Sequence, residues 1–317
     1  MSGKRGAGEL SLRQHRGMRL DLPAGYTARP ARLRDAEALT ELVAACEKHD
    51  TGEVLIELED IVSDWQRPSV DLAQHSVLVF HEAELAAAAE VSKARRAEVF
   101  VRPEHRGHGL GSTLMRWTWD VVRHAGGSVV GQSIPDSLVD ARELFEQHGY
   151  EQMWTSWILG LPPDAPLLDG DVPEGVRVRT FRPGEDERAV HELIEEAFNE
   201  WPNREPTTFE DWSAVVLGDP RFSPEQVQVA VERDEVIGVC LAELTDDVCW
   251  VDQIAVRRDH RGRGLGRALL MRAFRQARER GTLRCELSTD TRTGALGLYE
   301  HVGMRVKSTY VHWAKQL

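Results

Sequence analysis

Short runs rich in apolar and β-branched residues recur along the chain in pairs, and a polar turn separates the two runs of each pair. In the first half, Val77–Phe80 and Leu85–Val91 show this pattern, which predicts a β-hairpin. In the second half, Val227–Glu232 and Val236–Leu244 show it again. The strands of a hairpin pair antiparallel, so we expect an antiparallel element of sheet in each half.

Amphipathic stretches lie before and after the hairpins. Asp35–Glu47 and Asp186–Asn199, rich in alanine, leucine and glutamate, predict a helix ahead of each hairpin. Beyond the second hairpin, a long helix is predicted by apolar residues at helical spacing, namely Leu265, Leu269, Phe274 and Ala277. Strands that alternate with helices indicate an α/β (α+β) fold, in which a mixed, mostly antiparallel twisted sheet is flanked by helices.

The two halves are copies of one unit. Three islands of similar sequence recur in the same order at nearly constant offset: residues 23–29 at 173–179, 106–111 at 261–266, and 144–150 at 298–304. Islands that share order and offset indicate a duplication. The predicted organisation is a disordered basic tail at 1–20, a first unit at 21–160, a Pro- and Asp-rich linker at 161–173, and a second unit at 174–317.

A glycine-rich turn leads from a predicted strand into the long helix of the second unit. It reads Arg261-Gly262-Arg263-Gly264-Leu265-Gly266. Glycines let the backbone approach a ligand, and the free N–H groups at a helix start form an anion site suited to pyrophosphate. The turn is neither a Walker A loop nor the dinucleotide fingerprint, because no Gly-Lys-Ser/Thr follows and the third glycine would fall on Arg267. A glycine-rich helix entry without a ligand is the alternative.

The charge balance restricts the class of partner. The chain of 317 residues has a formal net charge of −13, although residues 1–20 hold five basic residues and one acidic residue. An acidic body disfavours non-specific nucleic-acid binding and favours cationic small molecules. The sequence contains no apolar signal segment and no run of 18 apolar residues, so we expect a cytoplasmic protein with no nucleic acid and no membrane among its partners.

The four cysteines, Cys46, Cys240, Cys249 and Cys285, form no C-x-x-C pair. The last three lie in strand-like runs, where a buried thiol behaves as a small hydrophobe. We therefore expect reduced thiols rather than a metal site or a disulfide framework.

The order of motifs in each unit is the basis of a resemblance to a known family. A strand, the R-G-x-G-x-G turn, a helix, a further strand and the motif at 298–304, which begins Leu-Tyr-Glu, resemble the GCN5-related N-acetyltransferase (GNAT) superfamily. Two such units in one chain resemble the tandem branch that includes mycothiol synthase. The resemblance covers the chain from about Tyr26 onward. It implies two tandem GNAT folds, acetyl-CoA (CoA) as co-substrate, no metal, and a small-molecule amine as acceptor.

The resemblance also implies which residues bind the donor. It places pyrophosphate on the glycine turn, pantetheine along the preceding strand, and the oxyanion hole in that strand. The residues implied in the second unit are Ile254, Ala255, Val256, Arg261, Gly262, Arg263, Gly264, Leu265 and Gly266. The first unit keeps the turn, so the residues expected to bind CoA there are Arg106, Gly107, Gly109 and Gly111. The family's usual asparagine before the short helix is replaced here by Thr291-Arg292-Thr293, which leaves that CoA contact without a counterpart.

Amide formation from a thioester requires a neutral amine, a stabilised oxyanion and a proton for the departing thiolate. Tyr299 matches the family's tyrosine that protonates the thiolate, and a phenol is a donor at neutral pH. Its alternative role is to pack the short helix. Glu286 matches a base position in some members, and Asp252 on the strand before the turn is the second candidate. Either carboxylate is alternatively a solvated strand residue.

The predicted acceptor-binding residues lie in the loop that joins the first two helices of the second unit. They are Glu200, Trp201 and Glu205. The carboxylates would hold a cationic amine and the indole would stack on it. Ordinary loop charges are the equal alternative. Acceptors in view are a cysteinyl-glucosaminyl-inositol pseudodisaccharide and an aminoglycoside-like antibiotic.

The two units differ where the chemistry is expected. Phe145 occupies the position of Tyr299, and the first unit has no carboxylate that matches Glu286. We therefore predict an N-acetyltransferase, a monomer or homodimer, that acts by direct attack in a ternary complex in its second unit. The alternatives are a CoA-binding regulatory protein without turnover and an enzyme of this fold that uses another acyl donor, such as an aminoacyl-tRNA.

Overall fold

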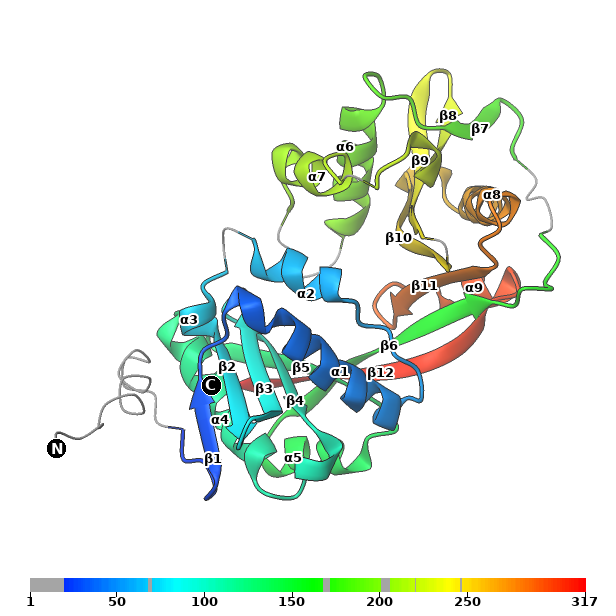
Figure 1. Ribbon diagram of the computed structural model, residues 1–317. Coiled ribbons are helices and arrows are strands. Elements are labelled where there is room, and N and C mark those ends of the chain that lie inside the picture. Colours follow the sequence, from blue (N-terminus) through cyan, green and yellow to red (C-terminus); the bar gives the residue numbers. More distant parts are fainter. Residues whose placement is uncertain (1–19, 68–69, 168–171, 201–205, 220, 246) are drawn as a thin grey trace, which may run out of the picture. The chain divides into compact units, whose positions relative to one another are not determined.

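The computed structural model describes residues 20–67, 70–167, 172–200, 206–219, 221–245 and 247–317 (Figure 1). The chain divides into two compact units. Unit 1 combines the chain up to Thr155 with Thr309–Leu317, and unit 2 spans Ser156–Ser308. The predicted basic tail lies, apart from Leu20, outside the described residues.

The sheet of unit 1 has the strand order β1-β2-β3-β4-β5-β12. Neighbouring strands pair antiparallel, except that β4 and β5 are parallel. The elements that form this unit are β1 (Tyr26–Arg29), α1 (Ala36–Asp50), α2 (Leu58–Trp65), α3 (Leu72–His75), β2 (Ser76–His81), β3 (Glu84–Ser92), β4 (Arg96–Val101), α4 (Leu110–His124), β5 (Val129–Pro135), α5 (Val139–Gln147), the start of β6 (Glu151–Leu161) and the end of β12 (Arg305–Gln316). The predicted first hairpin is β2–β3.

Unit 2 repeats this order with β6-β11-β10-β9-β8-β7. Here β10 and β11 are the parallel pair, and the other neighbours pair antiparallel. Besides parts of β6 and β12, its elements are β7 (Val176–Thr180), α6 (Glu187–Phe198), α7 (Phe209–Val216), β8 (Val227–Glu232), β9 (Glu235–Leu244), β10 (Val248–Val256), α8 (Leu265–Glu279), β11 (Arg284–Asp290) and α9 (Leu296–His301). The predicted second hairpin is β8–β9.

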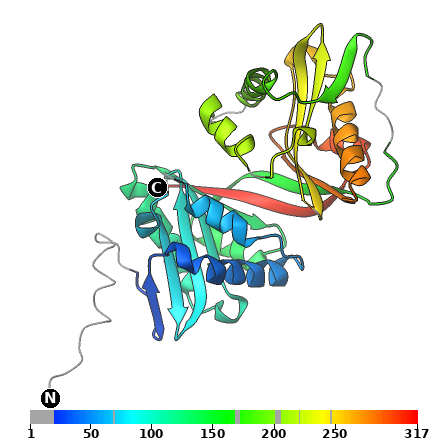
Figure 2. The same cartoon turned by 45° about the horizontal axis from the view of Figure 1, so that its top comes forward.

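Helices cover both faces of the sheet in unit 2. In both views α6 and α7 lie on one face and α8 lies on the other (Figures 1 and 2). The four apolar positions that predicted the long helix, Leu265, Leu269, Phe274 and Ala277, are all buried between α8 and the sheet. Ile194 and Trp212 are buried against the opposite face. The apolar stripe of each helix therefore faces the sheet, which is the arrangement that its spacing predicts.

The final strands of the two repeats are exchanged between the units. Residues Tyr310–Gln316 of β12 pair antiparallel with β5 in unit 1. Residues Ser156–Leu161 of β6 pair antiparallel with β11 in unit 2. The predicted boundaries at 160 and 174 thus differ from the division of the chain, which falls within these two strands.

The exchange follows from the nature of strand pairing. A free strand edge accepts any strand of suitable length and pattern, because the ladder is made by backbone groups. The last strands of the two repeats occupy equivalent positions in a duplicated unit, so sequence patterning does not distinguish which sheet each one joins. As a result, His312 belongs to unit 1, where it stacks on Trp154 at 4.7 Å between ring centroids and its Nδ1 lies 2.6 Å from Ser133 Oγ.

Candidate active site

A cavity of about 590 Å³ lies in unit 2 where β10 and β11 separate. The parallel ladder between them runs only from Val248↔Arg284 to Val251↔Leu287. Beyond Val251, β10 remains paired with β9, and β11 remains paired with β6. The edge of β10 from Asp252 to Val256 therefore borders the cavity with backbone groups that β11 does not use, and such an edge offers free hydrogen-bond donors and acceptors.

Most of the residues predicted for the second unit line this one cavity. They are Glu200, Asp252, Ile254, Ala255, Val256, Arg261, Gly262, Gly264, Leu265, Gly266 and Tyr299. Arg263 and Glu286 are not among its lining residues. Trp201 and Glu205, the other two predicted acceptor contacts, lie outside the described residues. Glu200 and Tyr299, which are 99 residues apart in the sequence, thus line the same cavity.

The glycine turn has the backbone conformation that an anion cradle requires. Gly262 has φ +72° and Gly264 has φ +82°, and Gly264 is the N-cap of α8. L-residues with side chains are strained at such angles. A Cβ placed on Gly262 would meet nothing within 4 Å, so the space above this glycine is open. Open amides at the positive end of a 15-residue helix favour a bound anion.

Arginines surround the turn, and carboxylates hold most of them. Arg261 donates from Nε to the Val256 carbonyl oxygen at 2.9 Å and from Nη1 to Glu200 Oε2 at 2.8 Å. Arg263 donates to Glu232 Oε1 at 3.2 Å. Arg267 lines the cavity, and its buried Nε has no hydrogen-bond partner in the part of the chain that the structure describes. An unpaired buried donor beside the turn suits a ligand that carries acceptor oxygens.

Tyr299 lies on α9 with 5% of its surface exposed, and it lines the cavity. Burial, and to a smaller extent the nearby Cys240, raise the pKa of Tyr299 to about 12. No hydrogen bond to another described residue engages the hydroxyl. The phenol is therefore protonated at neutral pH and available to donate a proton into the cavity.

Asp252 lies on a β-bulge in β10. Val251 pairs with Ala242 and Gln253 pairs with Leu241, so Asp252 is the extra residue between two successive partners. A bulge re-aims a side chain, and here the carboxylate of Asp252 borders the cavity. Desolvation by the surrounding protein, followed by the charge of Glu243, raises the pKa of Asp252. A carboxylate with a raised pKa is a stronger base than an ordinary aspartate.

Glu286 has a different environment. It is 5% exposed, and its Oε1 accepts hydrogen bonds from Lys307 Nζ at 2.9 Å and from Arg284 Nε at 3.2 Å. Two cationic side chains thus donate to the same carboxylate oxygen. Of the two bases that the sequence proposes, the structure brings Asp252 into one cavity with Tyr299 and places Glu286 in an ion-pair cluster beside it.

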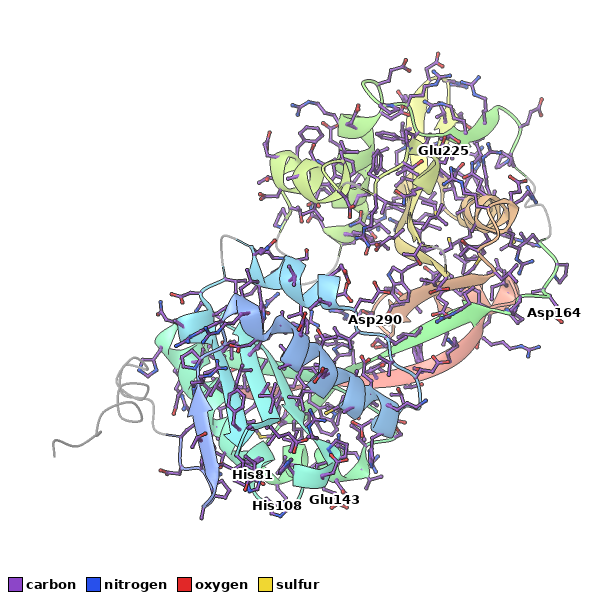
Figure 3. The ribbon with its side chains drawn as sticks, in the orientation of Figure 1. His81, His108, Glu143, Asp164, Glu225 and Asp290 are labelled. Atoms are coloured by element: carbon purple, nitrogen blue, oxygen red, sulfur yellow. The ribbon has the colours of Figure 1, made fainter. Side chains whose placement is uncertain are left out.

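Several cavity residues were not singled out by the sequence. They come from the end of α6, from β11, from the stretch before α9 and from α9 itself, namely Ala197, Phe198, Leu287, Ser288, Thr289, Thr293, Ala295 and Leu298. The hydroxyls of Thr289 and Thr293 are 2.8 Å apart. Arg292, in the stretch that replaces the family's asparagine, donates from Nε to Asp290 Oδ2 at 3.1 Å; Asp290 is labelled in Figure 3 at the end of β11. The departure at residues 291–293 was the one signal in the sequence that pointed to this wall.

Comparison with known proteins agrees with this geometry. A mycothiol acetyltransferase from Thermobispora bispora is 31% identical over 279 residues, which are 85% of this chain and 92% of that protein. One from Thermobifida fusca is also 31% identical and covers 72% of this chain and 77% of its own length. The model of the acetyltransferase (GNAT) family matches residues 187–304, and a second model, of the acetyltransferase (GNAT) domain, matches residues 73–152. The chain belongs to the GNAT family.

Solved structures agree on the tandem GNAT architecture. The crystal structure of a GCN5-related N-acetyltransferase from Sphaerobacter thermophilus has 37% sequence identity and a TM-score of 0.81, and the match covers 93% of this chain and 96% of that one. A tandem GNAT protein from the clavulanic acid biosynthesis pathway has the same fold, with a TM-score of 0.73 at 16% identity. The predicted family, the duplicated fold and the class of enzyme, an N-acetyltransferase, are confirmed.

The first GNAT unit keeps the glycine turn. Gly107 has φ +78° and Gly109 has φ +82°, close to the values of their counterparts. Arg106 is bound through Nη1 and Nη2 to both carboxylate oxygens of Asp50, at 2.7 and 2.8 Å. The turn itself therefore does not distinguish the two units.

The chemistry of the two GNAT units differs around this turn. Phe145 stacks on Tyr150 at 4.8 Å and contacts Trp313 edge-on at 5.9 Å, so an aromatic cluster without a free hydroxyl fills the position of Tyr299. The hydroxyl of Tyr150 accepts hydrogen bonds from Trp119 Nε1 and Gln132 Nε2, at 2.9 and 2.8 Å. The pairing of β3 with β4 is regular from Ala87↔Val101 to Ser92↔Arg96, without the bulge that carries Asp252.

The described residues contain neither a cluster suited to a metal ion nor a helix suited to a membrane. No group of three or more His, Cys, Asp or Glu side chains among them is arranged to hold a metal ion. Within the same residues, no helix combines the length and the apolar character needed to cross a membrane. Acetyltransferases of the GNAT family use acetyl-CoA as co-substrate.

Proposed function

We propose that this chain transfers an acetyl group from acetyl-CoA to the primary amine of a small molecule, by direct attack in a ternary complex in unit 2. The observation that supports the proposal best is the convergence of four features on one cavity. These are the open glycine turn, the unpaired edge of β10, the hydroxyl of Tyr299 and the carboxylate of Asp252. Each feature supplies one requirement of acyl transfer from a thioester.

The residues around the turn fit the diphosphate of CoA. The free amides from Arg263 to Gly266, at the start of α8, would hold its oxygens, and the buried Nε of Arg267 would gain a partner. The pantetheine arm would pair with the free edge of β10 near Ile254 and Val256. Acetyl-CoA supplies an activated acyl group on sulfur, and the protein has to position it and stabilise the charges that develop.

The proposed steps balance as follows. Asp252 takes a proton from the ammonium of the acceptor, and the neutral amine attacks the thioester carbonyl. Backbone N–H groups at the edge of β10 stabilise the tetrahedral oxyanion, with about 3 kcal/mol typical for one donor. The C–S bond then breaks, and Tyr299 donates a proton to the departing thiolate. The adduct's nitrogen loses its second proton as the amide forms, and this proton returns Tyr299 to the phenol, while Asp252 releases its own proton to solvent. Burial raises the pKa of Tyr299, which makes the phenol a weaker acid, but the same burial disfavours a thiolate in the cavity and so favours a neutral thiol product.

The relatives narrow the choice of acceptor. The similar proteins from Thermobispora bispora and Thermobifida fusca are mycothiol acetyltransferases. We therefore propose the cysteinyl-glucosaminyl-inositol pseudodisaccharide as the first acceptor to test and an aminoglycoside as the second. The carboxylates of Asp252 and Glu200 on the cavity wall suit a cationic amine of either kind.

Unit 1 is proposed to be non-catalytic. It has Phe145 in place of the tyrosine, and its β4 lacks the bulge of β10. A unit with an intact turn and no proton donor suits a structural role, or CoA binding without turnover. The assignment of catalysis to unit 2 depends on this contrast.

The test is a free-thiol release assay with acetyl-CoA and a panel of amines, on the wild type and on Tyr299→Phe. The expected result is amine-dependent release of CoA that falls about 10²-fold in the variant. Phe145→Tyr is the matched control, because it adds a hydroxyl at the equivalent position of unit 1 and should not restore a Tyr299→Phe background. If none of the amines on the panel leads to release of CoA, the proposed enzyme is rejected in favour of a CoA-binding regulatory protein. Restoration by Phe145→Tyr would show that unit 1 can catalyse the reaction once it has a tyrosine, which would contradict the proposal that this unit has no other part of the active site.

A further inference from the structure

In both units, the arginine that opens the glycine turn is bonded to a carboxylate at the end of the unit's first helix. In unit 1 the pair is Arg106–Asp50, and Asp50 is the last residue of α1. In unit 2 it is Arg261–Glu200, and Glu200 follows α6 by two residues. In both, the arginine Nε also donates to a carbonyl of the preceding strand, at 3.1 Å in unit 1 and 2.9 Å in unit 2. The pair is thus a duplicated feature of the chain.

The two copies of the pair differ in strength. Asp50 is bound through both oxygens, His49 Nδ1 lies 2.8 Å from one of them, and only 9% of its side chain is exposed. Among the described residues, Glu200 makes a single side-chain hydrogen bond, to Arg261 at 2.8 Å, and the side chains of Glu200 and Arg261 are 39% and 41% exposed. A bidentate, largely buried pair is strong, whereas an exposed single contact is worth about 0–1 kcal/mol. The Arg106–Asp50 pair of unit 1 is therefore hard to break, whereas a competing anion can readily separate Arg261 from Glu200 in unit 2.

The Arg261–Glu200 pair lies between the sites proposed for CoA and for the acceptor amine. Arg261 borders the cavity at the glycine turn, where the diphosphate is proposed to bind, and Glu200 borders it at the end of α6. The hydrogen bond from Arg261 lowers the pKa of Glu200, so the carboxylate is ionised at neutral pH. While the ion pair is formed, Glu200 neutralises the positive charge that would attract the diphosphate, and Arg261 neutralises the negative charge that would attract the ammonium of the acceptor. The diphosphate carries negative charge and competes with Glu200 for the guanidinium.

On the basis of the proposed function, we infer that Arg261–Glu200 is an exchangeable ion pair that couples the two substrates. The diphosphate of acyl-CoA displaces Glu200 from Arg261, and the released carboxylate receives the ammonium of the acceptor. Glu200 is then a specificity-determining residue for cationic acceptors, and donor binding strengthens acceptor binding. The reciprocal also holds, because coupling between two sites acts in both directions.

The first test is a calorimetric titration of CoA into the full chain and into Glu200→Gln. The variant releases Arg261 before CoA arrives, so CoA should bind about two- to fivefold more tightly, which is the range of an exposed pair. Glu196→Gln is the matched control, because it removes one exposed negative charge one turn earlier, on α6 itself. CoA binding to Glu200→Gln that is no tighter than to Glu196→Gln would overturn the inference. Absence of CoA binding to the wild type would overturn the proposed function as well.

The second test measures the KM for acetyl-CoA and the KM for the amine in the free-thiol assay, with the amine that the wild type turns over best. Glu200→Gln should lower the KM for acetyl-CoA and raise the KM for the amine, and Glu200→Asp should recover amine binding in part. A residue that only stabilises its loop would not change the two KM values in opposite directions. If both KM values rise together, the coupling is wrong while the acetyltransferase stands. If no amine releases thiol, the proposed function fails, and the titration still decides whether the ion pair competes with CoA.

Discussion

Glu90 in unit 1 provides a quantitative test of the folded structure. It lies on β3 beneath α2, where Trp65 Nε1 donates to its Oε1 at 2.8 Å, and its partner in the β3–β4 register is Glu98. Desolvation by burial raises the pKa of Glu90 to about 7, with smaller contributions from the charges of Glu98 and Asp64 and an opposing one from Trp65. The ordinary value is 4.5.

The direction of the pH effect follows from this difference. Because the folded pKa exceeds the unfolded one, the folded state holds the proton more tightly. The associated stability is complete below about pH 4.5 and is lost as the pH rises through about 7. The gap between the two values corresponds to about 3 kcal/mol in the free energy of unfolding. Above about pH 8, unit 1 therefore carries the full cost of an ionised, half-buried carboxylate.

Glu90→Gln removes this cost and keeps an oxygen that accepts the hydrogen bond from Trp65. We expect the variant to be more stable than the wild type by about 1–3 kcal/mol near pH 8, and the difference to shrink toward zero near pH 5. Glu41→Gln is the control: Glu41 is an exposed residue of α1, and its substitution should change stability by less than about 0.5 kcal/mol at either pH.

Urea unfolding read by hydrogen exchange of the β2–β4 peptides would measure unit 1 separately from unit 2. Equal pH dependence in the wild type and in Glu90→Gln would refute the reasoning, because it would mean that Glu90 titrates in the folded protein as it does in water. A variant that is destabilised at both pH values would also refute it, since the amide would then have failed to replace the carboxyl group beneath α2.

Three further predictions concern unit 2. Asp252→Asn should lower kcat/KM by about 10²-fold or more and remove the acidic limb of the pH profile. Because the pKa of Asp252 is raised, this limb should lie at a higher pH than an ordinary aspartate would give. An unchanged limb in the variant would exclude Asp252 as the base. Glu286→Gln should reduce kcat/KM far less but lower the thermal stability by about 1–3 kcal/mol, because Lys307 and Arg284 lose a buried partner; the reverse order of the two activities would restore Glu286 as the base. Gly264→Ala should weaken CoA binding in a calorimetric titration and destabilise the turn by about 1–2 kcal/mol, since Gly264 has φ +82°. Gly297→Ala, at a glycine of α9 without positive φ and with no atom within 4 Å of a new Cβ, is its control and should bind CoA normally.

Local and periodic features of this protein could be predicted from its sequence. The hairpins, the long helix and the glycine turn depend on residues close together in the chain, so spacing and glycine content indicate them directly. The duplication was visible because three islands kept their order and offset. The contrast between Tyr299 and Phe145 followed from aligning the two repeats. The structure places Tyr299 at the cavity and Phe145 in an aromatic cluster.

Other features were decided only by contacts between residues distant in the chain. Which sheet each final strand joins depends on backbone pairing, to which the side-chain pattern is nearly indifferent, so the exchange of β6 and β12 was not predictable. The sequence left Asp252 and Glu286 as equal candidates. A bulge turns Asp252 to the cavity, whereas Glu286 forms an ion pair with Lys307, which lies 21 residues after it in the chain. Electrostatic environment belongs to the tertiary fold, because it depends on which charges meet in space.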